Sequence, residues 1–328
     1  MAIETIKQIK VNDLRVGMYV VLTKPWLDHP FYKNDFLISS EKQLKKILKL
    51  GLEDVLIDTG KGRDVDRDTK AYTAEIIEDK EPSEKEINQN LIDAISSKRY
   101  SSEEKAGIVY KRSVDLIKVI FDNPVEEVIS EGKKGLYNVV ELFLTDYETT
   151  NNLIRSVSHI NSPYIHSVNV GVYSVALSKQ LFKGTACHDM HELGAAFFLH
   201  DIGKARIDSA IVNKTGKFTD AEMKEMQAHP VYGYKLLEET GHLTGEAGIV
   251  TMQHHERHDG SGYPLGLEGV DIHEYGRICC IADVYDAMTS RRFYKKELGS
   301  FKALQVMKEE MAGHFSKEMF EKFVLLFF

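Results

Sequence analysis

Hydrophobic and polar positions divide the chain into two parts with different periods. Short runs with the length and residue types of β-strands occur at 15–22, 36–39 and 54–58. A stretch with helical spacing, 41–50, lies among them and is followed by Gly51, a residue common just past a helix C-terminus. This pattern predicts a small α+β unit at the N-terminus.

A charged segment, from 61 to about 106, follows this unit and contains few apolar residues. Such a composition favours a solvated connector with some helix. Ser101 and Glu104 then form the Ser-x-x-Glu pattern of a helix N-terminus. We expect the helix that follows to end at Asn123-Pro124.

Helical periodicity persists from there almost to the last residue, without an internal repeat. We therefore predict a mainly α protein of two parts. A small α+β accessory domain with its charged linker is expected over 1–100, and an all-α helical bundle over 101–328.

The overall charge excludes one class of function and favours another. A formal net charge of −8 argues against a DNA-binding protein, because non-specific nucleic-acid binders carry a basic face. An anionic substrate would need local cations, which bound divalent metals supply. Cys187, Cys279 and Cys280 are an odd set with two adjacent members, which indicates a reducing compartment. Because no apolar run is long enough to span a bilayer, we predict a cytoplasmic protein.

The strongest local signal is the motif His200-Asp201-Ile202-Gly203-Lys204, which follows the apolar run 193–199. A buried imidazole and carboxylate are costly unless they are paired, and metal coordination is a common solution. Lys204 follows closely enough to reach a substrate phosphate near the same site. The motif therefore predicts a metal site with a catalytic Asp201 and Lys204.

Further candidate ligands are spread along the helical part: His166, His229, His254, His255 and Asp283. Each histidine alone is more often an ordinary core residue than a ligand. Together with His200 and Asp201 they supply the mixed nitrogen and oxygen set that suits two divalent ions of the iron, manganese or zinc type. Two such ions favour hydrolysis of a phosphodiester, with Asp201 as a bridging carboxylate.

Two other segments lie beside these candidates. The glycine-rich stretch that ends in Gly262-Tyr263-Pro264 would be an ordinary turn in isolation, but its place after His254-His255 favours a functional loop. Residues 289–295, Thr-Ser-Arg-Arg-Phe-Tyr-Lys, suggest a phosphate clamp. Solvated surface charge explains the second segment equally well.

Taken together, the motifs resemble the HD-GYP family of bacterial cyclic di-GMP phosphodiesterases, a branch of the HD superfamily of metal-dependent phosphohydrolases. The resemblance covers about 160–325 and includes HDIGK, AIVNKTGKFTDAEMKEMQAHPVYG, HHERHDGSGYPLGLEG and IADVYDAMTSRRFYKK in family order. Residues 14–58 resemble an uncharacterised domain often found ahead of HD-GYP domains.

The resemblance implies roles for individual residues. The metal ligands would be His166, His200, Asp201, His229, His254, His255 and Asp283. Lys204, Arg292 and Lys295 would hold substrate phosphates, and Tyr263 would face the substrate from the signature loop Gly262-Tyr263-Pro264. In the family this loop is linked to substrate access and to contact with diguanylate cyclase domains. Ser162 stands where some members carry a glutamate and bind a third metal, so a dinuclear site is expected.

The function implied is hydrolysis of cyclic di-GMP to pGpG, and further to GMP, by a water activated at two iron or manganese ions. Two alternatives remain. The substrate could be the hybrid dinucleotide cyclic GMP-AMP, because metal ligands do not sense the base. The chain could instead be a non-catalytic adaptor that binds the dinucleotide or a cyclase, although a complete ligand set argues against this.

Overall fold

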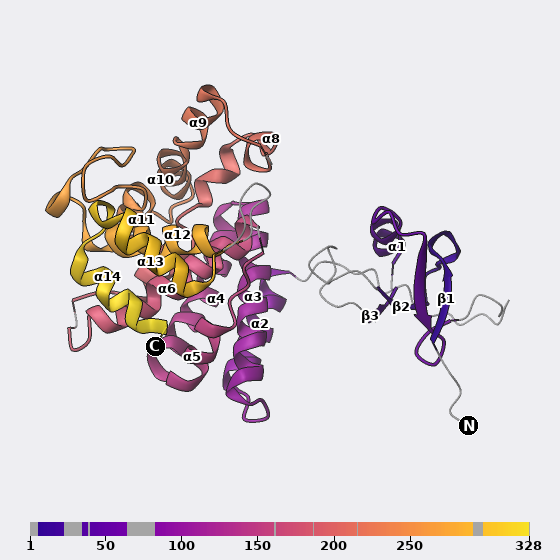
Figure 1. The fold of residues 1–328 in the computed structure, drawn as a ribbon. Coiled ribbons are helices and arrows are strands. Elements are labelled where there is room, and N and C mark those ends of the chain that lie inside the picture. Colours follow the sequence, from indigo (N-terminus) through magenta and orange to yellow (C-terminus); the bar gives the residue numbers. More distant parts are fainter. Residues whose placement is uncertain are drawn as a thin grey trace. The chain divides into compact units, whose positions relative to one another are not determined.

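The computed structural model describes most of the chain, and its contacts divide it into two units, Met1–Glu81 and Pro82–Phe328 (Figure 1). The described residues are 6–22, 35–38, 40–63, 83–160, 162–185, 187–214, 216–290 and 298–327. Each unit is described by itself.

Cys187, Cys279 and Cys280 are free thiols. No helix among the described residues is both long enough and apolar enough to cross a membrane.

The first unit is a four-stranded antiparallel sheet with one helix. The strands β1 (Ile6–Lys10), β2 (Tyr19–Val21), β3 (Asp35–Leu37) and β4 (Asp54–Asp58) are ordered β1-β4-β2-β3. Ser40 caps the N-terminus of helix α1 (Glu41–Leu48), because its hydroxyl accepts from the Gln43 backbone amide at 3.2 Å. Val20, Ile47 and Ile57 are fully buried in the core of this first unit. The sequence analysis missed β1, because two isoleucines among polar residues leave little pattern in this edge strand.

The secondary-structure elements in the described part of the second unit are all helices, which confirms the predicted fold class. Its helices are α2 (Glu84–Ser96), α3 (Ser102–Asp122), α4 (Glu126–Thr145), α5 (Tyr147–Arg155), α6 (Pro163–Leu181), α7 (Met190–Phe198), α8 (Ser209–Val212), α9 (Asp220–Met226), α10 (His229–Glu239), α11 (Gly245–Gln253), α12 (Glu274–Thr289), α13 (Ser300–Glu310) and α14 (Lys317–Val324). Helix α3 begins with the predicted capping box of Ser101 and Glu104.

Helix α2 belongs to the second unit, although the sequence analysis placed it in the connector of the N-terminal domain. Its apolar residues Ile87 and Leu91 are fully buried against α3 and α4. The Asn88 amide donates to the Glu131 carbonyl of α4 at 2.7 Å. The charged residues on the outer face of α2 make its apolar stripe hard to recognise in the sequence. Because α2 packs with the second unit, the boundary between the units lies near 81 rather than near 100.

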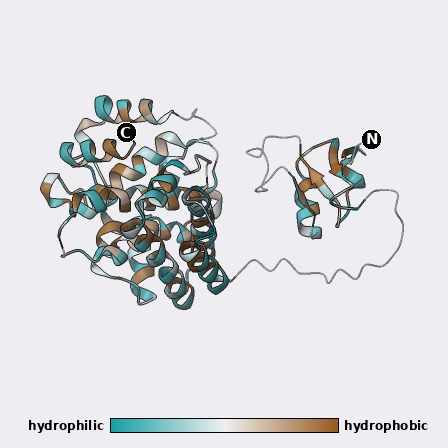
Figure 2. Ribbon diagram, turned by 90° about the horizontal axis from the view of Figure 1, so that it is seen from below, coloured by the Kyte–Doolittle hydropathy of each residue, from teal (hydrophilic) through white to brown (hydrophobic). Residues whose placement is uncertain are grey.

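Helix α6 lies at the centre of the second unit and carries the first candidate ligand near its N-terminus. Every residue from Ser167 to Ser178 is buried, and α6 packs against α7 on one side and α12 on another. Figure 2 shows hydrophobic and hydrophilic residues alternating along the helices of this unit, as expected for helices with one inward face. This packing sets the mutual positions of α6, α7 and α12, the helices that carry or precede four of the seven candidate ligands.

The contact between α6 and α7 depends on a small residue at Gly171. A Cβ atom built there would lie 2.4 Å from Cδ1 of Phe198, whose ring is fully buried. We expect Gly171→Ala to lower the free energy of unfolding by about 1–3 kcal/mol, the usual cost of overpacking. Gly107→Ala in α3 is the control, because a Cβ there meets nothing within 4 Å. It should be neutral or stabilising by up to about 1 kcal/mol. Urea unfolding measures both, and equal effects would contradict this account of the α6–α7 contact.

Candidate metal centre

The His200-Asp201 pair lies in the turn between α7 and a short 3-10 helix, Ile202–Arg206. Both side chains are almost completely buried, with 0% and 1% exposed. Gly203 lets the N-terminus of α10 approach this turn, since a Cβ there would lie 2.0 Å from the His229 carbonyl oxygen. The close approach places His229 Nε2 3.1 Å from Asp201 Oδ1. The glycine of the motif therefore has a steric role at the site.

Three of the imidazoles are oriented in the same way by backbone carbonyls. A carbonyl can only accept, so the ring nitrogen Nδ1 beside it must carry the hydrogen. The three contacts are His200 Nδ1 to Phe197 O at 2.9 Å, His229 Nδ1 to Met226 O at 2.7 Å, and His254 Nδ1 to Thr251 O at 2.9 Å. When such a ring is neutral, its Nε2 presents a lone pair.

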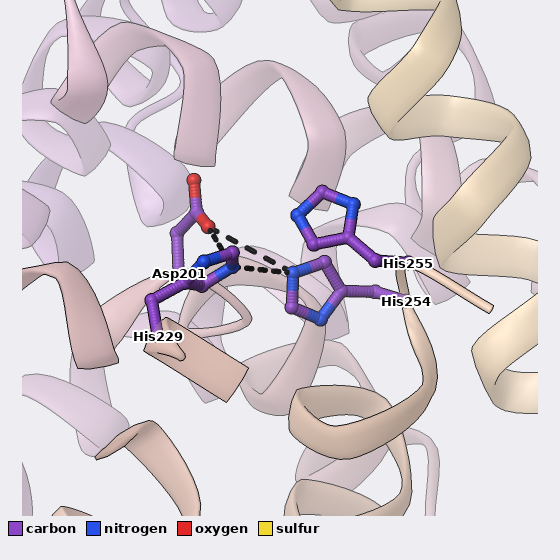
Figure 3. Close-up of side chains that lie close together, drawn as sticks. All are labelled: Asp201, His229, His254 and His255. Atoms are coloured by element: carbon purple, nitrogen blue, oxygen red, sulfur yellow. Dashed lines mark hydrogen bonds and ion pairs between the residues drawn. The ribbon is translucent and has the colours of Figure 1, made fainter. Parts of the chain in front are cut away.

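These lone pairs converge on the Asp201 carboxylate, and Figure 3 shows His229 and His254 directed towards it. Nε2 of His254 lies 3.8 Å from Asp201 Oδ1, and Nε2 of His200 lies 3.5 Å from Oδ2. Nε2 of His229 and Nε2 of His254 are only 3.1 Å apart. His200 Nε2 and Asp201 Oδ1 are buried without a hydrogen-bond donor among the described residues. Buried acceptors that face one another repel unless a cation lies among them, so the donor set fits a divalent metal.

The remaining expected ligands complete the cluster. Asp283 of α12 lies between two imidazoles, with Oδ1 3.1 Å from His166 Nε2 and Oδ2 3.3 Å from His255 Nδ1. His166 Nε2 is also 3.6 Å from Asp201 Oδ2. Two groups could each hold an ion: Asp201 with His229, His254 and His255, and Asp201 with His166 and His200. Asp201 is common to both, which is the arrangement of a bridging carboxylate.

Burial and charge set the protonation of the cluster. Burial lowers the pKa of His200 and His254, and lowers that of His255 to about 3. Burial alone would raise the pKa of Asp201, but the Lys204 ammonium holds it well below its usual value. These groups therefore have the ionised carboxylate and neutral imidazoles that a metal requires.

His166 is the exception, because it faces two carboxylates. Burial opposes its charge, but hydrogen bonds with Asp283 and Asp286 outweigh burial and raise its pKa to about 10. Its Nδ1 lies 2.7 Å from Asp286 Oδ2. The hydrogen bond to Asp286 orients the ring, and the contact with Asp283 is made by Nε2, the atom that would bind a metal.

A hydrogen-bond network extends from His166 through Asp286 and Asn169 to Ser158 and Tyr110. Asn169 donates to Asp286 Oδ1 at 2.6 Å and to the Ser158 carbonyl at 2.8 Å. The Tyr110 hydroxyl donates to Asn169 Oδ1 at 2.7 Å and accepts from the Ser158 amide at 3.0 Å. The sequence analysis missed this network. Its one local signal is the i, i+3 spacing of Asp283 and Asp286 in α12.

The signature loop is held against the cluster by Glu256, another residue that the sequence analysis passed over. Its buried carboxylate accepts from the backbone amides of Leu265, Gly266 and Leu267 at 2.7, 3.2 and 3.0 Å. Gly262 approaches the backbone closely, with a built Cβ 2.4 Å from the Arg257 nitrogen.

The loop carries Tyr263 to the metal-ligand cluster. The Tyr263 ring stacks on His255 with centroids 4.7 Å apart. The loop continues with Pro264, which is exposed to an intermediate degree. This stacking contact places Tyr263 beside a candidate ligand.

A cavity of about 990 Å³ opens over the cluster. Its walls include His166, His229, His255, Asp283, Tyr263 and Ser162. Among the described residues three cationic side chains line it: Lys204, Lys214 and Arg257. Lys204 contacts the Asp201 carboxylate directly. Arg292 and Lys295 lie outside the described residues, so the predicted phosphate clamp remains a prediction.

Comparisons with known proteins identify related domains and chains. Residues 167–319 match the family model of the HD domain, and residues 6–127 match a domain of unknown function, DUF3391. The cyclic di-GMP phosphodiesterase PA4108 of Pseudomonas aeruginosa is 32% identical over 97% of this chain and 76% of its own length.

Two other relatives match over a smaller part of their length. A cyclic di-GMP phosphodiesterase of Thermotoga maritima is 29% identical over 66% of this chain and 56% of its own length. The 3'3'-cGAMP-specific phosphodiesterase 3 of Vibrio cholerae is 37% identical over 48% of this chain and 34% of its own length. The chain thus spans between a third and about half of these two relatives.

A solved structure supports the fold. Bd1817, described as a HDG"Y"P protein from Bdellovibrio bacteriovorus, superposes with a TM-score of 0.60 over 97% of this chain and 98% of its own, at 16% identity. This likeness concerns the fold alone. On the identity and coverage of the Pseudomonas relative, together with the HD-domain match, the chain belongs to the HD-GYP family of HD-domain proteins, with a DUF3391 domain ahead of the HD domain.

Proposed function

We propose that the protein hydrolyses cyclic di-GMP to linear pGpG, and further to GMP, with two divalent ions, iron or manganese, as cofactors. The observation that carries the proposal is the convergence of the seven expected ligands beside a cavity of about 990 Å³. Six of them form two groups that share Asp201, and the seventh, Asp283, contacts His166 and His255. The relatives named as cyclic di-GMP phosphodiesterases support the substrate.

The chain's own residues would bind and orient the substrate. Bound metal ions supply Lewis acidity and lower the pKa of water at the site. Lys204, Lys214 and Arg257 line the cavity and would neutralise phosphate oxygens. We propose the same role for Arg292 and Lys295, which lie outside the described residues. Tyr263 would contact the substrate from its position on His255. Burial raises the pKa of Tyr263, so its hydroxyl stays a hydrogen-bond donor.

A second substrate has support from one comparison, the 37% identity to a 3'3'-cGAMP-specific phosphodiesterase. We therefore keep cyclic GMP-AMP as the alternative substrate, and competition between the two dinucleotides distinguishes them. A role as a non-catalytic adaptor would require tight binding without cleavage. The segment that follows the signature loop presents Leu265 and Val270, which are 54% and 87% exposed. This exposure supports the proposal that the loop contacts diguanylate cyclase domains.

The first test concerns the bridging carboxylate. Protein purified with manganese should convert cyclic di-GMP to pGpG, and Asp201→Asn should lose turnover and most of its bound metal, because an amide oxygen cannot bridge two cations as a carboxylate does. Metal analysis and chromatography of products measure the two effects. The control is Asp93→Asn on the exposed face of α2. Full metal occupancy of the wild-type protein without cleavage would overturn the proposed function.

The second test concerns Asp286, which positions His166 without being an expected ligand. Asp286 accepts from both His166 Nδ1 and Asn169 Nδ2, whereas an asparagine offers only one accepting oxygen. We expect Asp286→Asn to weaken manganese affinity about 10- to 100-fold, the usual effect of losing such a partner. Equilibrium dialysis measures it, and thermal unfolding of the chelated protein serves as the control for folding. Unchanged affinity would refute the positioning role.

The third test concerns the proton on His166. Because its pKa is about 10, the chelated protein holds this proton at pH 8, and a metal that binds Nε2 must displace it. Manganese binding at pH 8 should therefore release about one proton from this ring, and affinity should rise with pH until about pH 10. Calorimetry in HEPES and in Tris, whose ionisation enthalpies differ, measures the release. Asp286→Asn should reduce it, since one of the two carboxylates that raise the pKa is lost. No proton release in the wild-type protein would contradict the assignment.

A further inference from the structure

We propose that the arm formed by residues 209–214 and 216–228, here called the base arm, is the subsite that binds one purine base of the substrate. The inference rests on the proposed function, because it presumes a nucleotide at the metal cluster. It assigns a role to a segment that contains none of the expected metal ligands and ends just before one of them, His229.

The base arm lies between two parts of the metal centre. It begins after the 3-10 helix that carries Lys204, includes α8 and α9, and ends where α10 begins at His229. Figure 1 shows α8 and α9 together beside α10, at one end of the helical unit. Residues of the arm and of the cluster line the same cavity. A phosphate at the metals therefore leaves the attached nucleoside within the space beside the arm.

The wall that the arm contributes is suited to a flat ring. Val212, Phe218, Met223 and Met226 line the cavity, and Met223 remains 44% exposed although it is apolar. Aromatic rings stack on bases of any sequence, and methionine makes favourable contacts with aromatic rings. Unpaired apolar surface of this kind, beside a polar metal site, provides a stacking platform.

Two carboxamides stand among these apolar residues, Asn213 and Gln227. The Asn213 Nδ2 donates to the Ser209 carbonyl at 2.8 Å, which leaves its Oδ1 as the atom able to accept a further hydrogen bond. Gln227 is exposed, so its carboxamide can form a hydrogen bond with a ligand. Purine edges carry donors and acceptors side by side, and side-chain amides pair with them.

The arm is held in shape before any ligand binds. Glu222 caps α9 by accepting from the Thr219 amide at 2.7 Å, and it also pairs with Lys214. These hydrogen bonds from Lys214 and Thr219 lower the pKa of Glu222 to about 2, so the pairing persists at neutral pH. A wall that is already ordered loses little entropy when it binds a base.

The test compares ligands with and without a base. GMP and ribose 5-phosphate share the phosphate and sugar, so only GMP should gain from the arm. We expect the manganese-loaded protein to bind GMP more tightly than ribose 5-phosphate by calorimetry. Phe218→Ala should weaken GMP roughly tenfold, the usual effect of losing one stacking ring, and leave ribose 5-phosphate within about twofold. Gln227→Ala should weaken GMP roughly fivefold, as expected for a lost base contact.

Matched controls come from α13, which contributes no residue to the described cavity wall. Phe301→Ala and Gln305→Ala remove the same side-chain types there and should change neither affinity. Equal affinity of the wild-type protein for the two ligands would overturn the inference. So would a Phe218→Ala variant that loses both ligands in the same proportion, since the arm would then support the metal site and not the base.

Turnover separates this inference from the proposed function. If the wild-type protein prefers GMP but does not cleave cyclic di-GMP or cyclic GMP-AMP, the base arm stands and the proposed hydrolysis fails. If it cleaves cyclic di-GMP, Phe218→Ala should raise the KM about tenfold. If the protein cleaves cyclic di-GMP and Phe218→Ala changes neither KM nor GMP binding, the proposed function stands and the inference about the base arm is overturned.

Discussion

The donation of Nδ1 hydrogens to backbone carbonyls by three buried imidazoles is the interaction on which the site depends. It fixes which nitrogen of His200, His229 and His254 is bare, and therefore directs three lone pairs towards one carboxylate, Asp201. Each carbonyl belongs to the residue three positions before its histidine, in the last turn of α7, α9 or α11. The ends of helices, where carbonyls lack partners within the helix, thus become the elements that orient the ligands.

Contacts between helices keep these helix ends in fixed positions relative to one another. Helix α6 is buried along most of its length between α7 and α12, and Gly203 admits the start of α10 to the metal-ligand turn. Asp286 and Asn169 then connect His166 with the backbone at Ser158, two residues before Ile160 in the cavity wall. The same two side chains therefore orient a candidate ligand and hold the backbone that leads to the cavity wall. We expect a substitution of either one to affect both.

Local charge differs from the charge of the whole chain. The net charge of −8 would repel an anionic dinucleotide, yet the described cavity wall carries Lys204, Lys214 and Arg257 beside the ligand set. Two divalent ions would add four positive charges where Asp201 and Asp283 supply two negative ones. Attraction for phosphate is thus confined to the cavity, which favours a specific small anion over nucleic acid in general.

The sequence by itself determined the helical class of the second unit, the start of α3 and the residue types of a metal site, because helical spacing, capping boxes and buried polar motifs are local patterns. Only the tertiary structure decided that α2 packs with the helical unit, that Asp286 and Tyr110 stand behind His166, and that Glu256 holds the signature loop. Asn169 contacts Tyr110 and Asp286 across 59 and 117 positions of sequence. No periodicity records such pairs, since they depend on how whole helices are packed and rotated against one another.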